Sequence, residues 1–176
     1  MKILIIGPAH PLRGGIANFS ERLAKAFQQE GDEVEVLSFS LQYPGFLFPG
    51  KTQYTDKTAP KLTIHTRINS INPLNWIRNG LWARKQDYDM IVVMYWQPFM
   101  SPCLGTISRI AGKRTFRVGQ LHNMIPHEPG KLDKIFSRYF VRSMDAFMAL
   151  SKSVLEDLKL FDKQKPRDLN PHPIYD

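Results

Sequence analysis

A loop with two adjacent glycines follows the first apolar run of the chain and has a composition suited to binding phosphate. It reads GPAHPLRGG, and Gly14 and Gly15 stand directly before an amphipathic segment. Paired glycines permit a tight turn and let backbone N–H groups approach a ligand closely. Because a helix N-terminus and Arg13 both place positive charge there, the loop favours a phosphate-bearing ligand. A purely structural turn is the alternative, and the spacing is not the GxGxxG of dinucleotide-binding folds.

The sequence gives little support for thiol or metal chemistry. Cys103 is the only cysteine of the chain, so it forms no internal disulfide and no multi-thiolate metal site, and we expect it to be a small buried side chain. His127 and Glu128 are adjacent, but they are not followed by the second histidine of an H-E-x-x-H zinc motif. We therefore expect neither a metal nor a cofactor.

The elements that must position the glycine loop alternate between strand and helix, the pattern of a parallel sheet covered on both faces. Short β-branched or alternating apolar runs predict strands at 2–6, 33–39, 62–67, 90–96, 115–121 and 146–150. Helical spacing predicts helices at 16–27, 72–85, 100–112, 131–142 and 151–160, with Asn72 and Ser151 as caps. The segment 41–60 reads as a long loop. The expected fold is a Rossmann-like, doubly wound, mostly parallel sheet in an α/β/α arrangement.

Length and composition are those of one domain. The chain has 176 residues, of which 43% are hydrophobic, enough for a single core. It contains no run of about 20 apolar residues to span a bilayer, and its opening apolar stretch is too short for a signal peptide. With its single cysteine, these features predict a cytoplasmic protein. We assign residues 1–165 to the domain and 166–176 to the start of a linker.

The charge balance is basic, with 24 Lys and Arg against 16 Asp and Glu and a net charge of +8. Such an excess favours anionic partners, among them phosphate groups and anionic lipid. Nucleic acid is not an expected partner, because the basic residues are scattered and no zinc-finger spacing, RNP-type aromatic strand or dense basic tract is found.

Several segments resemble, in order, the N-terminal domain of family 4 glycosyltransferases of the two-domain GT-B type. GPAHPLRGGIANFSERLAKAF is similar to the family's opening strand, glycine pair and amphipathic helix. GQLHNMIPHEP resembles the exit of the fifth strand, DAFMALSKSVLEDL the strand and helix that close the first domain, and NPHPIYD the segment leading to the second domain. The resemblance therefore covers the chain from end to end.

The resemblance implies roles for particular residues. Gly14 and Gly15 match the glycine pair whose amides lie near the donor diphosphate or a phosphorylated acceptor, with Arg13 beside them. His122 matches the cleft histidine that contacts the transferred sugar, as a positioning hydrogen-bond partner rather than a nucleophile. A polar residue packed at a strand end is the alternative for His122. Asn123 replaces the more usual Asp, which leaves a charge-based role there open.

Three further residues are possible acceptor contacts. His127 and Glu128 follow His122 on a loop and could meet the acceptor, or they could simply lie on the surface. His10 stands where related inverting enzymes of this fold place a general base. A base there needs a carboxylate to orient it and raise its basicity, and a loop histidine beside Pro11 is the simpler interpretation.

The activity implied is retaining transfer of a sugar from a nucleotide-sugar donor to a glycan or lipid-linked acceptor, as in polysaccharide biosynthesis. In this family the second domain holds most of the donor, and we expect that domain to be absent here and the chain to be inactive alone. Three alternatives stay open: an inverting transferase with His10 as base, a stand-alone nucleotide or phosphate-binding module, and an interaction protein with an aromatic interface.

A second hypothesis concerns contact with an anionic membrane. Aromatic and aliphatic residues combine with positive charge in two segments, a mixture suited to an anionic lipid surface. The alternative is that the tryptophans of the second segment are core residues. The segments are the loop with Tyr43, Phe46, Leu47 and Phe48, and the helix with Trp76, Ile77, Leu81, Trp82, Arg78, Arg84 and Lys85.

Overall fold

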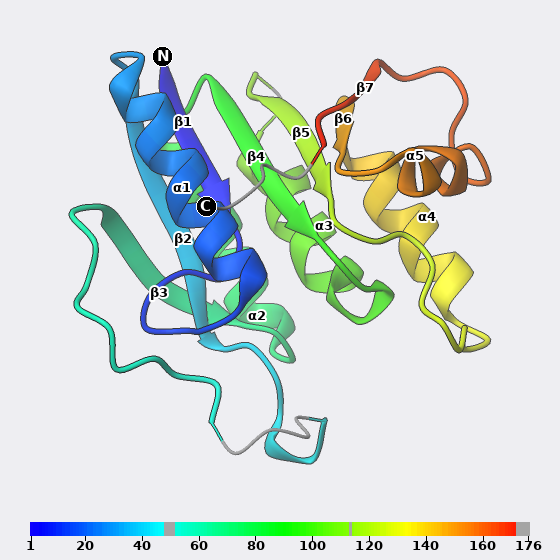
Figure 1. Ribbon diagram of the computed structural model, residues 1–176, viewed down its shortest axis with the longest axis horizontal. Coiled ribbons are helices and arrows are strands. Elements are labelled where there is room, and N and C mark those ends of the chain that lie inside the picture. Colours follow the sequence, from blue (N-terminus) through cyan, green and yellow to red (C-terminus); the bar gives the residue numbers. More distant parts are fainter. Residues whose placement is uncertain (48–51, 113, 172–176) are drawn as a thin grey trace.

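A seven-stranded parallel sheet forms the centre of the computed structural model, which describes residues 1–47, 52–112 and 114–171 (Figure 1). The strand order is β3-β2-β1-β4-β5-β6-β7, and every neighbouring pair is parallel. This confirms the expected doubly wound α/β fold. The strands are β1 (Lys2–Ile6), β2 (Glu33–Leu41), β3 (Thr63–Asn69), β4 (Met90–Tyr95), β5 (Phe116–Leu121), β6 (Ala146–Ala149) and β7 (Arg167–Leu169).

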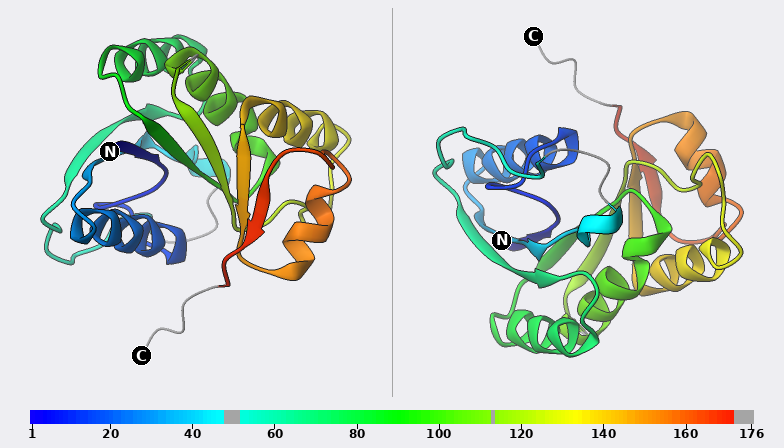
Figure 2. Two further views of the ribbon diagram at one scale, coloured as in Figure 1. Left: turned by 90° about the horizontal axis from the view of Figure 1, so that it is seen from above. Right: turned by 90° about the horizontal axis from the view of Figure 1, so that it is seen from below.

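Helices cover both faces of the sheet (Figure 2). One face carries α2, α3 and α4, which also pack against one another in sequence, and the other carries α1 and α5. The helices are α1 (Gly15–Gln29), α2 (Pro73–Lys85), α3 (Ser101–Ala111), α4 (Asp133–Ser143) and α5 (Lys152–Leu158), with short 3-10 turns η1 (Gly45–Leu47) and η2 (Pro98–Met100). The described part of the chain contains no helix that is both long and apolar enough to cross a bilayer.

The central strand β1 explains why the sequence reads as apolar without interruption at its start. Successive side chains of a strand point to opposite faces. Ile3 and Ile5 therefore belong to the core under α1, and Leu4 and Ile6 to the core under α2, α3 and α4. All four are fully buried. A strand covered on both faces needs apolar residues at every position, so it lacks the alternation of a half-exposed strand.

Two helix caps predicted from the sequence are present. The side chain of Asn72 accepts hydrogen bonds from the backbone N–H groups of Leu74 and Asn75, and Pro73 occupies the first turn of α2. The hydroxyl of Ser151 accepts a hydrogen bond from the backbone N–H of Val154 at the start of α5. Side-chain oxygens at these positions replace the hydrogen bonds that the first helical N–H groups lack, which is why both helices begin where they do.

The seventh strand lies within the segment that the sequence analysis assigned to a linker. β7 pairs with β6 in parallel register, and Arg167 donates a hydrogen bond from Nη2 to Oδ1 of Asp162. Three residues are too few to show a period of two, so no pattern in the sequence marked this strand. Part of the assigned linker therefore belongs to the domain, and residues 172–176 lie outside the described ranges.

The strand order changes direction around β1, whose neighbours are β2 on one side and β4 on the other. Connections leaving β1 and β4 go to opposite faces of the sheet, α1 covering one and α3 the other. Ligands of such folds bind at the carboxyl ends of the strands beside this switch point. The site is therefore expected where the loop after β1 meets the end of β4.

Candidate functional site

The glycine turn after β1 forms the amino end of α1. Gly14 is the N-cap, with φ 132° and ψ 171°, a conformation that side-chain-bearing residues rarely adopt. Its carbonyl accepts a hydrogen bond from the N–H of Asn18, so the helix starts at Gly15. No side chain caps this end, and the first turn has no acidic residue. The positive end of the helix dipole is therefore available to an anion.

A cleft of about 200 Å³ opens over this turn, and we name it the glycine cleft. One wall is the backbone from Gly14 to Ala17 together with Arg13. The other wall comes from the ends of β2 and β4 and from the long loop between β2 and β3. Its lining residues are Gln42, Tyr43, Gln53 and Trp96, with Pro8 at the end of β1. The loops after three parallel strands thus meet at one edge of the sheet.

Tyr43 and Trp96 are tied together in the wall of the glycine cleft. The hydroxyl oxygen of Tyr43 accepts hydrogen bonds from Nε1 of Trp96 at 2.7 Å and from Nε2 of Gln97 at 3.1 Å. The indole ring of Trp96 also meets Phe39 edge to face, with the ring centroids 6.1 Å apart. Burial raises the pKa of Tyr43, against the effect of the Trp96 bond, so the hydroxyl stays protonated at neutral pH. The wall therefore offers a rigid aromatic surface.

A second, more polar cleft of about 340 Å³ adjoins the first through Arg13 and Gly14. We name it the histidine cleft, because His10 lines it together with Asn18, Glu21 and Lys57. The outer wall comes from the loop between β2 and β3, which is held by two backbone hydrogen bonds. The N–H of Arg13 donates to the carbonyl of Gln53, and the N–H of Thr55 donates to the carbonyl of Pro11, both at 2.9 Å.

The contacts of His10 do not match those of a general base. Its Nε2 lies 3.1 Å from the carbonyl oxygen of Lys57, so Nε2 is the donor in this contact. Oε1 of Glu21 accepts a hydrogen bond from the backbone N–H of His10 at 2.8 Å rather than from its ring. The carboxylate that a base requires is therefore engaged in holding the loop, not in orienting the imidazole.

His122 lies on the α1 face of the same edge. It directly follows β5, and its backbone N–H donates to the carbonyl of Tyr95 at 2.8 Å. The imidazole meets the ring of Phe19 edge to face, with the centroids 5.0 Å apart, and its Nε2 lies 3.4 Å from Sδ of Met94. Because Phe19 is one helical turn beyond Gly15, α1 connects the imidazole to the glycine turn.

Close packing at the end of β1 sets the position of α1 relative to this histidine. A Cβ on Gly7 would lie 2.5 Å from Cγ of Met94 and 3.2 Å from Oγ of Ser20. Only glycine leaves room here for Met94 and the first turns of α1 to approach β1 together. The same methionine contacts His122, so the glycine contributes to the placement of the imidazole.

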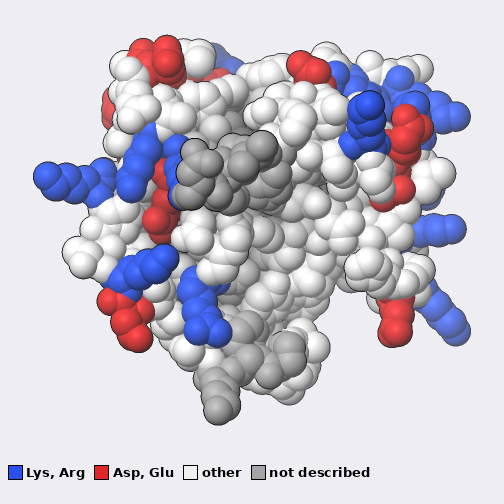
Figure 3. Space-filling view, viewed as in Figure 1, with Lys and Arg blue, Asp and Glu red and all other residues white. Residues whose placement is uncertain are grey.

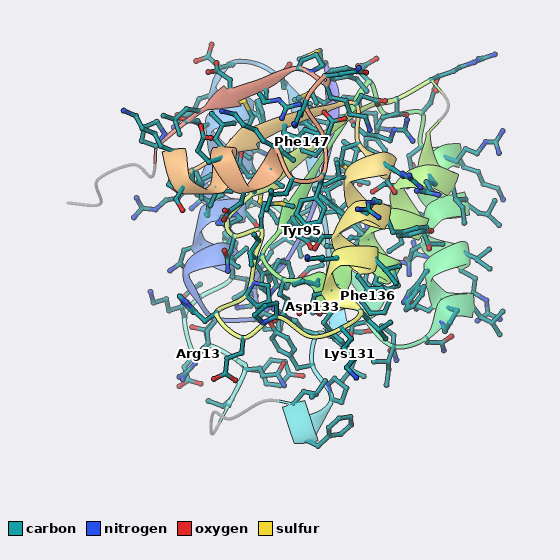
Figure 4. All side chains as sticks on the ribbon, turned by 90° about the vertical axis from the view of Figure 1, so that its right-hand side faces the viewer. Arg13, Tyr95, Lys131, Asp133, Phe136 and Phe147 are labelled. Atoms are coloured by element: carbon teal, nitrogen blue, oxygen red, sulfur yellow. The ribbon has the colours of Figure 1, made fainter. Side chains whose placement is uncertain are left out.

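The remaining candidate residues lie on the loop between β5 and α4. Asn123 is half-buried beside His122, whereas His127 and Glu128 are exposed and line neither of the two clefts. Figure 4 shows Arg13 at the same end of the molecule as Asp133, where α4 begins, while Phe147 of β6 lies toward the other end. The loop therefore approaches the site edge without bringing His127 or Glu128 into either cleft.

Sequence analysis missed the aromatic wall. Tyr43 was grouped with a membrane-facing loop, but it is half-buried and bonded inside the glycine cleft. Trp96 directly follows β4, and the rule that ligands bind at carboxyl ends of strands could have identified it. Gln42, Gln53 and Glu21 offered no comparable signal, because their positions depend on how the long loop folds back on the turn.

The sequence of the chain matches the model of Glycosyltransferase Family 4 over residues 13–168. The chain belongs to glycosyltransferase family 4. No curated protein matches it in sequence. The matched range includes the glycine turn and His122, and it covers strands β2 to β6 and the first two residues of β7.

Solved structures share the fold of this family 4 domain. Acinetobacter baumannii MurG superposes with a TM-score of 0.53 at 14% identity, covering 94% of this chain and 44% of its own. A sucrose-phosphate synthase chain from Thermosynechococcus elongatus gives 0.61 at 13% identity, covering 99% and 90%. An alpha-glucosyltransferase in complex with UDP-glucose and DNA containing an abasic site gives 0.54 at 12% identity, covering 97% and 42%. The chain thus spans less than half of the first and third, and it has the fold of a GT-B glycosyltransferase domain.

Proposed function

We propose that this family 4 chain is the acceptor-side half of a retaining glycosyltransferase. It moves a sugar from a nucleotide-sugar donor to a glycan or lipid-linked acceptor, a step of polysaccharide biosynthesis. The observation that carries the proposal is the uncapped amino end of α1, which opens into the glycine cleft at the carboxyl edge of the sheet. The structural relative crystallised with UDP-glucose has the same fold, which supports a nucleotide-sugar donor.

The glycine cleft suits the diphosphate of such a donor. The N–H groups of the first helical turn and the exposed Arg13 supply positive charge without a metal ion. In a transfer reaction this charge stabilises the diphosphate as it leaves the sugar, which lowers the barrier electrostatically. The aromatic wall of Tyr43 and Trp96 offers an apolar surface against which a sugar ring can lie.

His122 positions the transferred sugar in this proposal. Phe19 and Met94 contact its ring, so the imidazole has a defined orientation. A neutral imidazole provides one donor and one acceptor, which suits hydroxyl groups of a sugar. The acceptor hydroxyl then attacks from the face that the diphosphate leaves, and no side chain of this chain acts as a nucleophile. Asn123, beside it, contributes an amide rather than a charge.

The reaction needs a second domain to complete the cleft. The chain covers 44% of MurG and 42% of the alpha-glucosyltransferase, and we propose that the complementary half holds most of the nucleotide. We also place the enzyme in the cytoplasm, because its single cysteine, Cys103, is unpaired and fully buried, an arrangement suited to a reducing compartment.

Two measurements on the purified 176-residue chain test this proposal. No turnover is expected with UDP-, ADP- or GDP-sugars and glycan or lipid acceptors, and turnover would contradict the need for a second domain. Inorganic pyrophosphate at millimolar concentration is expected to shift the amide NMR signals of Gly14 to Ala17, since the helix end alone binds weakly.

Paired variants separate specific binding from a general charge effect. Arg13→Gln is expected to weaken pyrophosphate binding about three- to fivefold, the size of one exposed ion pair. Lys25→Gln removes a cation from the exposed side of the same helix and is the control, with no expected change. Equal losses in both variants, or shifts that avoid the glycine turn, would argue against the diphosphate site.

A further inference from the structure

The outer face of α2 carries an unpartnered apolar stripe. Leu74, Ile77 and Leu81 are 66%, 42% and 46% exposed, and Ile71, just before the helix, is 51% exposed. Positions three and four residues apart lie on one face of a helix, so the three helical side chains form a continuous row. We name Ile71, Leu74, Ile77 and Leu81 the α2 stripe.

The opposite face of α2 is firmly attached to the domain. Nε1 of Trp76 donates to the carbonyl of Asn69 at 2.7 Å, and the ring of Trp82 lies 4.7 Å, centroid to centroid, from the ring of His65. Both tryptophans are half-buried and pack against the core, which favours the alternative that they are core residues over a role as membrane anchors. The exposed aliphatic row is thus a surface of a well-packed helix rather than a loosely attached segment.

Positive charge flanks the stripe. Arg78, Arg84 and Lys85 are exposed on α2, and the helix contains no acidic residue. The guanidinium of Arg67 on β3 adds a cation above the ring of Trp82, 4.7 Å from its centroid. Around the face shown in Figure 3, by contrast, Lys and Arg side chains stand beside Asp and Glu. The helix therefore combines aliphatic side chains with Lys and Arg alone, and the exposed Asp87 beyond its end lines a cleft with Arg84.

We propose that the α2 stripe docks the protein on an anionic lipid surface. Aliphatic side chains flanked by Lys and Arg suit the boundary between acyl chains and acidic headgroups. Protein interfaces are instead enriched in aromatic residues and match their partner in shape. The α2 stripe has no aromatic member, and it lines neither the glycine cleft nor the histidine cleft.

A second copy of the chain fits this surface poorly. A twofold dimer formed through the stripe would bring the same patch of both copies together. Arg78, Arg84 and Lys85 of one copy would then face those of the other, with no carboxylate on α2 to compensate them. Like charges in such proximity oppose association, whereas acidic lipid headgroups attract the same three cations.

The loop with Phe46 and Leu47 is a separate exposed site at the same edge of the sheet. Phe46 is 86% exposed and Leu47 46% exposed on η1, after the end of β2. Phe48, also considered a membrane anchor from the sequence, lies outside the described residues. Because the docking surface is defined by α2, changes on η1 are expected to reduce lipid binding less than changes in the stripe.

Vesicle flotation of the full chain tests the proposal. Vesicles of phosphatidylglycerol and phosphatidylcholine are expected to carry the protein upward at low salt, and vesicles of phosphatidylcholine alone are not. Raising the salt to about 0.5 M should release most of the protein, since the Debye length falls to roughly 4 Å. Absence of flotation with the anionic vesicles at low salt overturns the proposal.

Matched variants identify the surface. Leu74→Ser with Leu81→Ser is expected to lower partitioning at least about tenfold, and Arg78→Gln with Arg84→Gln about 30-fold. The control, Ile135→Ser with Leu160→Ser, removes aliphatic side chains that are 59% and 68% exposed outside α2 and should change little. Circular dichroism verifies that each variant is folded. If the Leu variant fails to fold, the Arg variant alone still tests whether α2 binds lipid.

Two results would contradict the proposal and would point to another surface or another partner. An equal loss in the control variant would show nonspecific adsorption of apolar side chains. A dimer detected by sedimentation and dissociated by Leu74→Ser with Leu81→Ser would assign the stripe to a second copy of the chain. Neither result bears on the pyrophosphate experiment, so lipid docking and sugar transfer are tested separately.

Discussion

Gly14 and Gly15 are adjacent, but they have different structural roles in the turn before α1. Gly14 has a positive φ of 132°, and Gly15 is the first helical residue. A Cβ on either would meet no atom within 4 Å, so crowding does not distinguish them. Backbone conformation distinguishes them. A side chain at Gly14 would be strained by the positive φ, whereas a side chain at Gly15 would have the ordinary conformation of the first turn of a helix.

Alanine substitutions at the two glycines should therefore have opposite effects on stability. Gly14→Ala is expected to lower the free energy of unfolding by about 1–3 kcal/mol, the cost of a strained backbone. Gly15→Ala is expected to leave it unchanged or raise it by up to about 1 kcal/mol, because alanine favours helix. Urea denaturation of both variants measures the difference. Equal losses would mean that the turn does not have the described backbone.

At the residue scale, the sequence could reveal those site residues whose positions depend on the local geometry of the chain. The glycine pair could be found because a tight turn before an amphipathic run needs it, whereas His122 was named through the resemblance to the family. The partnership of Tyr43 with Trp96 joins residues 53 positions apart in sequence. No local pattern could show it, since it depends on how the loop after β2 folds over the end of β4.

At the scale of elements, β5 and β6 are joined at their amino ends by an ion pair. Arg117 donates from Nε and Nη2 to the two carboxylate oxygens of Asp145, at 3.0 and 2.9 Å, and its backbone N–H also donates to Oδ2. Burial alone would raise the pKa of Asp145, but the hydrogen bonds from Arg117 lower it below the ordinary 3.8. The charged carboxylate is thus the form that the folded chain prefers.

This ion pair predicts a loss of stability in acid. A carboxyl whose pKa is lower in the folded state stabilises it above the unfolded pKa, and that contribution is lost as pH falls through the folded pKa. Asp145→Asn should lower stability at pH 7 by about 1 kcal/mol and reduce the slope of stability against pH below pH 5. Thermal melts from pH 7 to pH 3 measure this, with Asp56→Asn, at an exposed loop position, as control. An unchanged slope in Asp145→Asn would refute the role assigned to the pair.

Most elements could be predicted because period and composition mark them. The run at β1 and the capped starts of α2 and α5 are examples, each explained by burial on both faces or by a side-chain cap. β7 could not be predicted, because its three residues form a strand only through pairing with β6. Its stability comes from contacts that are distant in sequence, and these leave no periodic trace.

At the scale of the whole molecule, the two cores share the same strands. Ile3 and Leu4 of β1 and Val92 and Val93 of β4 alternate between the core under α1 and the core under α2 to α4. Because the same strands contribute to both cores, the loss of either helix layer would expose one whole apolar face of the shared sheet. This arrangement favours a single cooperative transition.

Unfolding should accordingly look the same to different probes. The three tryptophans, Trp76, Trp82 and Trp96, report on the part of the molecule around β3, α2 and the end of β4, whereas far-UV circular dichroism reports on all helices. Their urea midpoints are expected to coincide. A tryptophan transition that precedes the loss of helix would show that the part containing α2 unfolds on its own.

The position of α2 has a consequence for how the proposed substrates would reach the domain. The first turn of α2 follows the end of β3, so the helix and its stripe begin at the carboxyl edge of the sheet, where the glycine cleft also lies. A molecule docked through the stripe would keep its glycine cleft uncovered, because no residue of the stripe lines that cleft. Under the proposed transfer function, a lipid-linked acceptor would then reach the cleft by two-dimensional diffusion, and a nucleotide-sugar donor would reach it from the aqueous phase.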